Sequence, residues 1–216
     1  APPAPRPPTP DELLDQVLDL YLKDHKIPKG VTPSFDFVTN VAGDQRNERI
    51  LCHDRDLVVF GKGFREGRAY VSLSMAQFSR GQDILDVNAR DVTGDGRADI
   101  LVRGVQRAQA PEQLGTGEVV REVLFVYTVA EPGITRVFAA ETAISHGERR
   151  LHSTVAFLPG SAATAIELRP GRSVGWSRRS WPFQQDTEAV SGVEPIVLPW
   201  TATPVRYRFA GLRYQR

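Results

Sequence analysis

The chain has 216 residues, of which 41% are hydrophobic and 25% charged, and its formal net charge is +1. This composition excludes a largely disordered chain. A disulfide scaffold is also excluded, because Cys52 is the only cysteine. No apolar run approaches the roughly 18 residues that a membrane-spanning helix needs, so we expect no membrane span. The charge balance lacks the strong basic excess of nucleic-acid-binding proteins, so we expect no nucleic-acid partner.

Residues 1–8 are rich in proline and predict a flexible, extended leader. The chain begins at Ala1 instead of methionine, as a mature chain does after its signal peptide has been removed, or as a sequence trimmed for expression does. We therefore expect an exported bacterial protein that is periplasmic, secreted or anchored at the cell surface.

Residues 9–26 carry a helical pattern. Thr9 and Glu12 form the signature of a capping box, with Pro10 at the first helical position. Apolar residues then recur at helical spacing: Leu14, Val17, Leu18 and Tyr21. The sequence predicts one N-terminal helix whose apolar face packs against the rest of the domain.

After Gly30, short β-rich runs alternate with turn residues. They predict strands at 34–39, 48–53, 56–60, 69–74, 84–89, 98–103, 119–129, 134–140, 151–157, 163–168, 195–198 and 204–209. Residues 170–194 predict a long loop, and no strong internal repeat is evident. We expect one mainly-β domain over residues 9–216, built as an antiparallel sandwich, barrel or curved meander with one N-terminal α-helix.

The most specific chemical pattern is DVTGDGRAD, at residues 91–99. Oxygen-bearing side chains stand at its positions 1, 3, 5 and 9, which are Asp91, Thr93, Asp95 and Asp99. Calcium takes six to eight oxygen ligands, and a short loop supplies them by wrapping the ion. The backbone carbonyl of Arg97 would be a further ligand. The alternative is a bare Asp/Gly turn, although closely spaced carboxylates repel one another without a cation.

The loop is not a complete EF-hand, because Val102 stands where an EF-hand has a bidentate glutamate. Its flanks also read as strands. Residues 86–104 instead resemble the strand–loop–strand calcium sites of FG-GAP/VCBS repeats, with the core D-x-x-G-D-G-x-x-D-[IL]. The resemblance implies a calcium loop like those of bacterial surface proteins. Two features depart from the family: Thr93 replaces an Asp or Asn, and one copy is found where the family carries several. Asp86, Asn88 or water would supply a missing ligand.

Two tryptophans close to arginines suggest a second kind of site. Trp176 and Trp181 flank Arg178 and Arg179. Exposed aromatic rings with polar neighbours can stack on sugars or clamp a peptide. The alternative is that the tryptophans anchor a long loop to the core.

Signs of catalysis are weak. Residues 171–175 match the G-x-S-x-G pattern of serine hydrolases, but none of the four histidines follows Ser173 and no helix is predicted after it. No acid/base pair stands at a recognisable spacing, so we assign no catalytic residues. The sequence predicts an exported, non-catalytic β-domain with structural calcium, serving adhesion or assembly at a cell surface. The alternative is a carbohydrate- or peptide-binding module that uses the Trp176–Trp181 loop.

Overall fold

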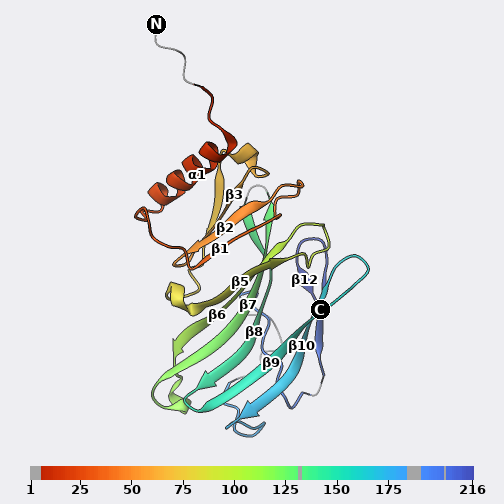
Figure 1. Cartoon of the computed structure of the whole chain (residues 1–216). Helices are drawn as coiled ribbons and strands as arrows, with labels where there is room; N and C mark the ends of the chain where they lie inside the picture. Colours follow the sequence, from red (N-terminus) through yellow and green to blue (C-terminus); the bar gives the residue numbers. More distant parts are fainter. Residues whose placement is uncertain (1–5, 131–132, 184–190, 202) are drawn as a thin grey trace. The chain divides into compact units, whose positions relative to one another are not determined.

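A computed structural model describes residues 6–130, 133–183, 191–201 and 203–216. The chain is mainly β, with one N-terminal α-helix and two antiparallel sheets (Figure 1), as the sequence predicts. It divides into two compact units. Unit 1 comprises Ala1–Met75 and Ala130–Ile134, and unit 2 comprises Ala76–Val129 and Thr135–Arg216. The sequence pattern gave no sign of this division.

Every strand pairs with the strand that precedes or follows it in the chain, so both sheets are meanders. The four-stranded sheet has the order β1-β2-β3-β4, and the eight-stranded sheet the order β12-β11-β10-β9-β8-β7-β6-β5. The elements are α1 (Pro10–Asp24), β1 (Phe35–Thr39), β2 (Glu48–His53), β3 (Asp56–Gly61), β4 (Tyr70–Ser74), β5 (Ile84–Arg90), β6 (Asp99–Gln109), β7 (Glu118–Ala130), β8 (Gly133–His146), β9 (Arg149–Leu158), β10 (Ala165–Val174), β11 (Val205–Phe209) and β12 (Tyr214–Gln215).

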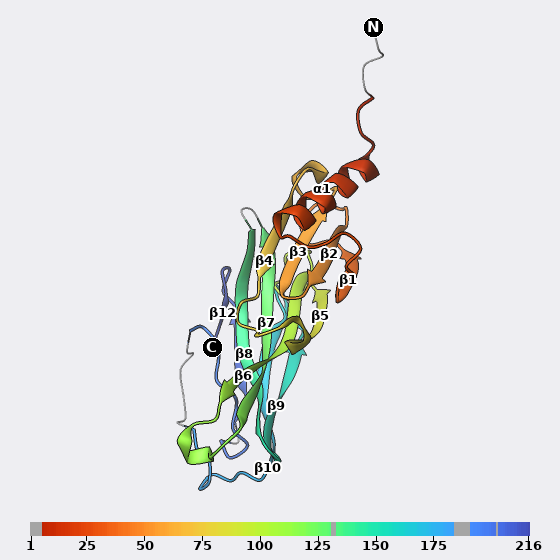
Figure 2. The ribbon, with the colours of Figure 1, turned by 90° about the vertical axis from the view of Figure 1, so that its left-hand side faces the viewer.

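The predicted helix and its capping box are confirmed in unit 1. The Thr9 Oγ1 accepts a hydrogen bond from the Glu12 backbone N–H, at 3.3 Å, and the Glu12 carboxylate accepts one from the Thr9 N–H, at 2.7 Å. The apolar face of α1 is buried against β2, β3 and β4 (Figure 2), in a cluster of Val17, Tyr21, Leu22, Leu51, Val58 and Phe60. Burial of this face, rather than the helical propensity of a short segment, is what stabilises a helix of this length.

Most of the eight-stranded sheet lies in unit 2, and the sheet carries two apolar clusters. One contains Phe138, Tyr207 and Tyr214, and the other contains Ile144, Leu151 and Trp176. The two clusters share one covering segment, residues 196–198, because Val197 belongs to the first and Ile196 and Leu198 belong to the second.

The predicted strand at 195–198 is wrong. Pro195 and Pro199 flank the segment and have no N–H to give to a ladder. The segment instead lies along the sheet through a parallel bridge between Glu194 and Ala140. The Ser153 hydroxyl donates to the Val197 carbonyl, at 3.0 Å, and accepts from the Val197 N–H, at 3.1 Å. A side chain therefore satisfies the backbone groups that a strand neighbour would otherwise satisfy.

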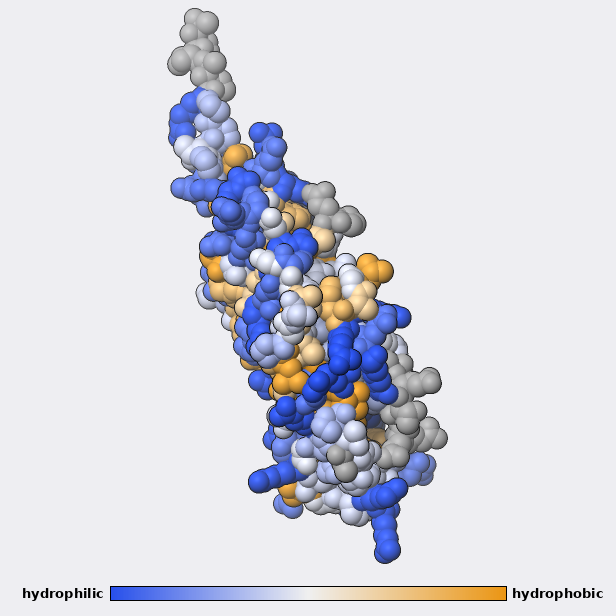
Figure 3. Space-filling model, turned by 90° about the vertical axis from the view of Figure 1, so that its right-hand side faces the viewer, coloured by the Kyte–Doolittle hydropathy of each residue, from blue (hydrophilic) through white to orange (hydrophobic). Residues whose placement is uncertain are grey.

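Hydrophilic side chains dominate the face seen in Figure 3, and hydrophobic ones form separate small patches between them. In the described part of the chain, no helix combines the length and the apolar composition that crossing a membrane demands. Residues 1–5 of the predicted leader lie outside the described residues, and Arg6, just after them, pairs with Glu12 of α1.

Candidate metal centre

The 91–99 loop joins β5 to β6, whose last and first residues, Arg90 and Asp99, are paired across the sheet. Gly94 and Gly96 have φ values of 80° and 81°, a region that favours glycine. A Cβ on Gly94 would also come closer than 3.0 Å to the carbonyl of Ala162, so no larger residue fits there. Strand pairing and these two glycines fix the shape of the loop.

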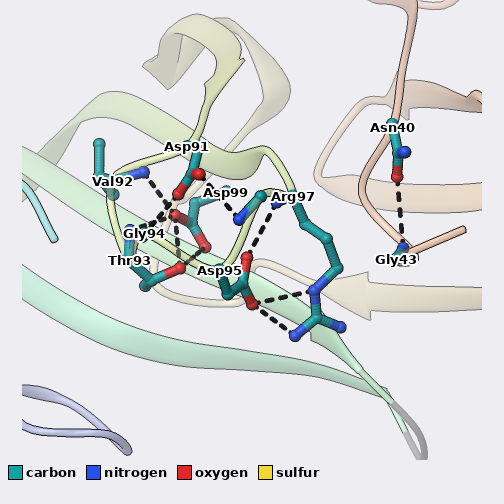
Figure 4. Close-up of polar contacts among 10 residues, drawn as sticks. Asn40, Gly43, Asp91, Val92, Thr93, Gly94, Asp95, Arg97 and Asp99 are labelled. Carbon is teal, nitrogen blue, oxygen red and sulfur yellow. Dashed lines mark hydrogen bonds and ion pairs between the residues drawn. The ribbon is translucent and has the colours of Figure 1, made fainter. Parts of the chain in front are cut away.

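All three loop carboxylates accept hydrogen bonds from nearby donors (Figure 4). Asp91 accepts hydrogen bonds from the backbone N–H groups of Gly94, at 2.6 Å, and Gly96, at 2.9 Å. Asp95 accepts from the backbone N–H of Arg97, at 3.0 Å, and from its guanidinium Nε, at 2.9 Å. Asp91 is therefore held by the backbone, whereas Asp95 is held largely by one side chain.

The third carboxylate, Asp99, is only 2% exposed. It accepts from the N–H groups of Val92, at 2.8 Å, and Thr93, at 2.9 Å, and from the Thr93 hydroxyl, at 3.1 Å. Burial raises the pKa of Asp99, and these three donors partly offset the rise. Asp99 thus organises the start of the loop from inside the domain.

Across the described ranges, no three His, Cys, Asp or Glu side chains are grouped closely enough to hold a metal ion. Asp91, Asp95 and Asp99 share one loop, but each faces protein donors. The Thr93 hydroxyl, predicted as a ligand, is bonded to Asp99. The Arg97 side chain, for which the sequence suggested no role, binds Asp95.

The two suggested supplementary ligands lie apart from the loop's hydrogen-bond network. The Asn88 amide donates to Asp86, at 2.6 Å, on β5. Both residues line a groove of about 720 Å³ on the eight-stranded sheet. The chemistry of the loop nevertheless suits a hard cation, since each carboxylate oxygen that accepts one hydrogen bond keeps a second lone pair.

No family model matches the chain, and neither does any curated protein or solved structure.

Unit 1 contains a second copy of the same loop, which the sequence analysis missed. Residues 40–48 read NVAGDQRNE and residues 91–99 read DVTGDGRAD, and the two align without a gap. In both, the ninth residue accepts from the backbone N–H groups of the second and third, and the first accepts from that of the fourth. The fifth accepts from the backbone N–H and guanidinium of the seventh. Both loops join two consecutive antiparallel strands. The expectation of no strong internal repeat is therefore wrong. Both loops share the pattern [DN]-V-x-G-D-x-R-x-[DE], which could have revealed the repeat in the sequence.

The groove on the eight-stranded sheet is a further feature that the sequence did not reveal. Leu101 and Leu124 are buried residues of its lining. Its charged lining residues are Asp86, Arg90, Arg103, Glu122, Arg150 and Arg172. The guanidinium of Arg90 lies 4.1 Å from the centre of the Phe157 ring, so a cation–π contact holds it at the wall. Arginines outnumber carboxylates, which gives the groove a basic character.

The tryptophan segment packs inward. Trp176 is 6% exposed and lies in the apolar cluster with Ile144 and Leu151. Its ring meets that of Trp181 edge to face, with centroids 5.3 Å apart. Arg178 and Arg179 are exposed on the turn between the two tryptophans. This packing favours the anchoring role of the tryptophans over a ligand-stacking role.

Proposed function

We propose that the protein is an exported, non-catalytic β-protein in which calcium, bound by the 91–99 loop, has a structural role. The observation that carries this proposal is the arrangement of the loop. Three carboxylates stand within nine residues between two paired strands, and backbone N–H groups already orient Asp91 and Asp99. The resemblance to FG-GAP/VCBS loops supports the same ion.

The carboxylates of Asp91, Asp95 and Asp99 and the carbonyl of Arg97 would hold the ion. Asp95 must exchange its Arg97 partner for the cation. The two side chains of this pair are about one-third exposed, at 35% and 33%. Exposed ion pairs contribute only about 0–1 kcal/mol, so this exchange costs little. The Thr93 hydroxyl would stay with Asp99 and help to hold that carboxylate in place.

Calcium would stiffen the connection between β5 and β6. An ion that binds the folded state alone stabilises it by about 1.4 kcal/mol at ten times its Kd. Sites in extracellular modules typically bind with Kd values of about 10⁻⁴ to 10⁻³ M. Such a site would be filled outside the cell, in line with the proposed roles in surface adhesion or assembly.

Isothermal titration calorimetry of chelator-stripped protein with CaCl₂ tests the proposal. We expect wild type and Glu148→Gln to bind equally, and Asp95→Ala to lose the heat that belongs to the 91–99 loop. Glu148→Gln is the matched control, since it removes an exposed carboxylate from the same unit but not from the loop or the groove. Binding that is identical in all three proteins, or absent up to several millimolar calcium, would refute the assignment.

The groove supports a second candidate function, a module that binds an acidic carbohydrate or peptide. The specific observation is its basic, partly apolar lining, which replaces the tryptophan loop as the place where such a ligand would bind. A polyglutamate peptide is the probe. Arg103→Ala combined with Arg172→Ala should abolish its binding, and Arg178→Ala combined with Arg179→Ala should not.

A further inference from the structure

Glu48, at the start of β2 in unit 1, is fully buried, with 0% exposure. Its Oε2 accepts hydrogen bonds from the N–H groups of Val41, at 3.0 Å, and Ala42, at 3.1 Å. Its Oε1 has no hydrogen-bond partner among the described residues. A buried carboxylate oxygen without a partner is costly, so this atom requires an explanation.

The comparison with the 91–99 loop shows why Oε1 lacks a partner. Glu48 is equivalent to Asp99, and Ala42 is equivalent to Thr93, whose hydroxyl lies within hydrogen-bond distance of both Asp99 oxygens, at 3.1 Å from Oδ2 and 3.3 Å from Oδ1. Ala42 has no such donor.

The free oxygen of Glu48 faces a second carboxylate beside Gly63. A Cβ built on Gly63 would come closer than 3.0 Å to both the Oε1 of Glu48 and the Oδ1 of Asp44. Each oxygen lies 2.4 Å from the position of that one Cβ, so the two oxygens are no more than 4.8 Å apart. Two carboxylates in this position repel each other unless a positive species lies between them.

We propose that Glu48 and Asp44 bind a hard divalent cation, calcium or magnesium, between these two oxygens, beside Gly63. Magnesium is commonly held by one or two carboxylates together with several waters, and calcium accepts the same oxygen ligands at 2.3–2.6 Å. Glu48 Oε1 and Asp44 Oδ1 would supply the two protein charges, and water would complete the coordination. Asp44 keeps its backbone donor, the N–H of Arg46, at 2.8 Å.

This site is separate from the 91–99 loop and does not depend on calcium binding there. A shared proton is the other positive species that fits between two carboxylates. Burial, together with the nearby charge of Asp44, raises the pKa of Glu48, so a proton competes with the cation for the position between the two oxygens. A metal titration distinguishes the two occupants, because a proton-bridged pair gives no saturable response to calcium or magnesium at neutral pH.

The test is a ¹⁵N-HSQC titration of the full, chelator-stripped chain, first with CaCl₂ and then separately with MgCl₂. The amides of Gly43 and Gly63 report on the unit 1 site, and those of Gly94 and Gly96 report on the 91–99 loop. The variants are Glu48→Gln and, as a matched control, Glu66→Gln, which removes an exposed carboxylate from the same unit. Asp95→Ala is included to remove the loop site alone.

We expect saturable shifts of Gly43 and Gly63 with at least one cation in wild type, Glu66→Gln and Asp95→Ala. In Glu48→Gln the apparent Kd should rise by about tenfold or more, because one of two charged ligands is lost. Glutamine preserves the acceptor for Val41 and Ala42, so the fold should persist. If that variant is nevertheless unfolded, Gly63→Ala, whose Cβ would press on both carboxylate oxygens, provides the same comparison.

The proposal is overturned if Gly43 and Gly63 fail to respond to several millimolar of either cation, or if they respond equally in Glu48→Gln. Shifts of Gly94 and Gly96 alone would uphold the 91–99 site and reject this one. Shifts of Gly43 and Gly63 alone would do the reverse.

Discussion

The Thr93 hydroxyl donates a hydrogen bond to the buried carboxylate of Asp99, at 3.1 Å. Its position in the loop predicted Thr93 as a calcium ligand, but its hydroxyl binds the Asp99 carboxylate instead. Ala42, which has no hydroxyl, occupies the equivalent position in the unit 1 loop. The two loops therefore share a backbone framework but differ in how fully their buried acid is satisfied.

We predict that Thr93→Ala lowers the free energy of unfolding by about 1 kcal/mol, the usual value of one lost hydrogen bond. The measurement is urea denaturation followed by far-UV circular dichroism in the presence of a chelator. Thr154→Ala, an exposed threonine on β9, is the control and should leave the midpoint unchanged. Equal midpoints for both variants would contradict a supporting role for the Thr93 hydroxyl.

We predict that Arg97→Ala tightens calcium binding by the 91–99 loop by about two- to fivefold. The guanidinium competes with the ion for Asp95, and an exposed pair of this kind is worth about 1 kcal/mol or less. Calorimetry beside Arg103→Ala controls for the loss of one positive charge from unit 2. Weaker binding in Arg97→Ala would mean that the arginine orders the loop and does not compete with calcium.

We predict an unusual pH dependence for unit 1. Because burial raises the folded-state pKa of Glu48, the folded state binds this proton more tightly than the unfolded chain does. Its contribution to stability is greatest below the ordinary pKa of 4.5 and is lost as the pH rises through the raised value. In chelator, the stability difference between Glu48→Gln and wild type should therefore grow with pH over that window.

The carboxyl of Asp36 provides the opposite case in the same unit, because its hydrogen bonds to Arg49 lower its pKa. Its contribution is present above the ordinary pKa and lost on acidification. Asp36→Asn should therefore lower the stability of unit 1 at neutral pH and change it little at low pH. Glu48→Gln should instead raise the stability at neutral pH, and this effect also fades at low pH. Urea midpoints at several pH values separate the two, since the variants shift stability in opposite directions at neutral pH.

We predict that Trp176→Ala costs about 3–5 kcal/mol of stability, as large-to-small changes of buried aromatic residues do. Arg178→Ala, two residues away on the exposed turn, should change it by no more than about 0.5 kcal/mol. Chemical denaturation monitored by circular dichroism measures both. A loss below 1 kcal/mol for Trp176→Ala would show that this segment does not anchor the core.

Local signals predicted much of the fold. The capping box at Thr9 and the strand at 48–53 lie where the sequence placed them, because adjacent residues determine both. Strand β10 runs beyond the predicted end at residue 168. The sequence predicted a long loop from residue 170 onward, but an irregularity between Pro170 and Ser173 lets the strand continue beside β9 to Val174. Such a bulge depends on the neighbouring strand and has no signature of its own.

The candidate sites show a similar limit. The spacing of Asp91, Asp95 and Asp99 identified one loop, but not that Arg97 would bind Asp95, which depends on side-chain conformation. The 40–48 loop escaped notice because asparagine, alanine and glutamate stand where its counterpart has aspartate, threonine and aspartate. Gly63 lies in the turn that follows β3, so only the folded chain brings it beside Glu48 and Asp44.

The meander order of both sheets has a consequence for how the chain is made. Each strand finds its partner in the strand synthesised just before it, and, apart from the long connection between β10 and β11, short loops join the paired strands. The four strands of unit 1 all precede the first strand of unit 2 in the chain. A growing polypeptide can therefore add hairpins one at a time from its N-terminus, with few unpaired strand edges waiting for distant residues.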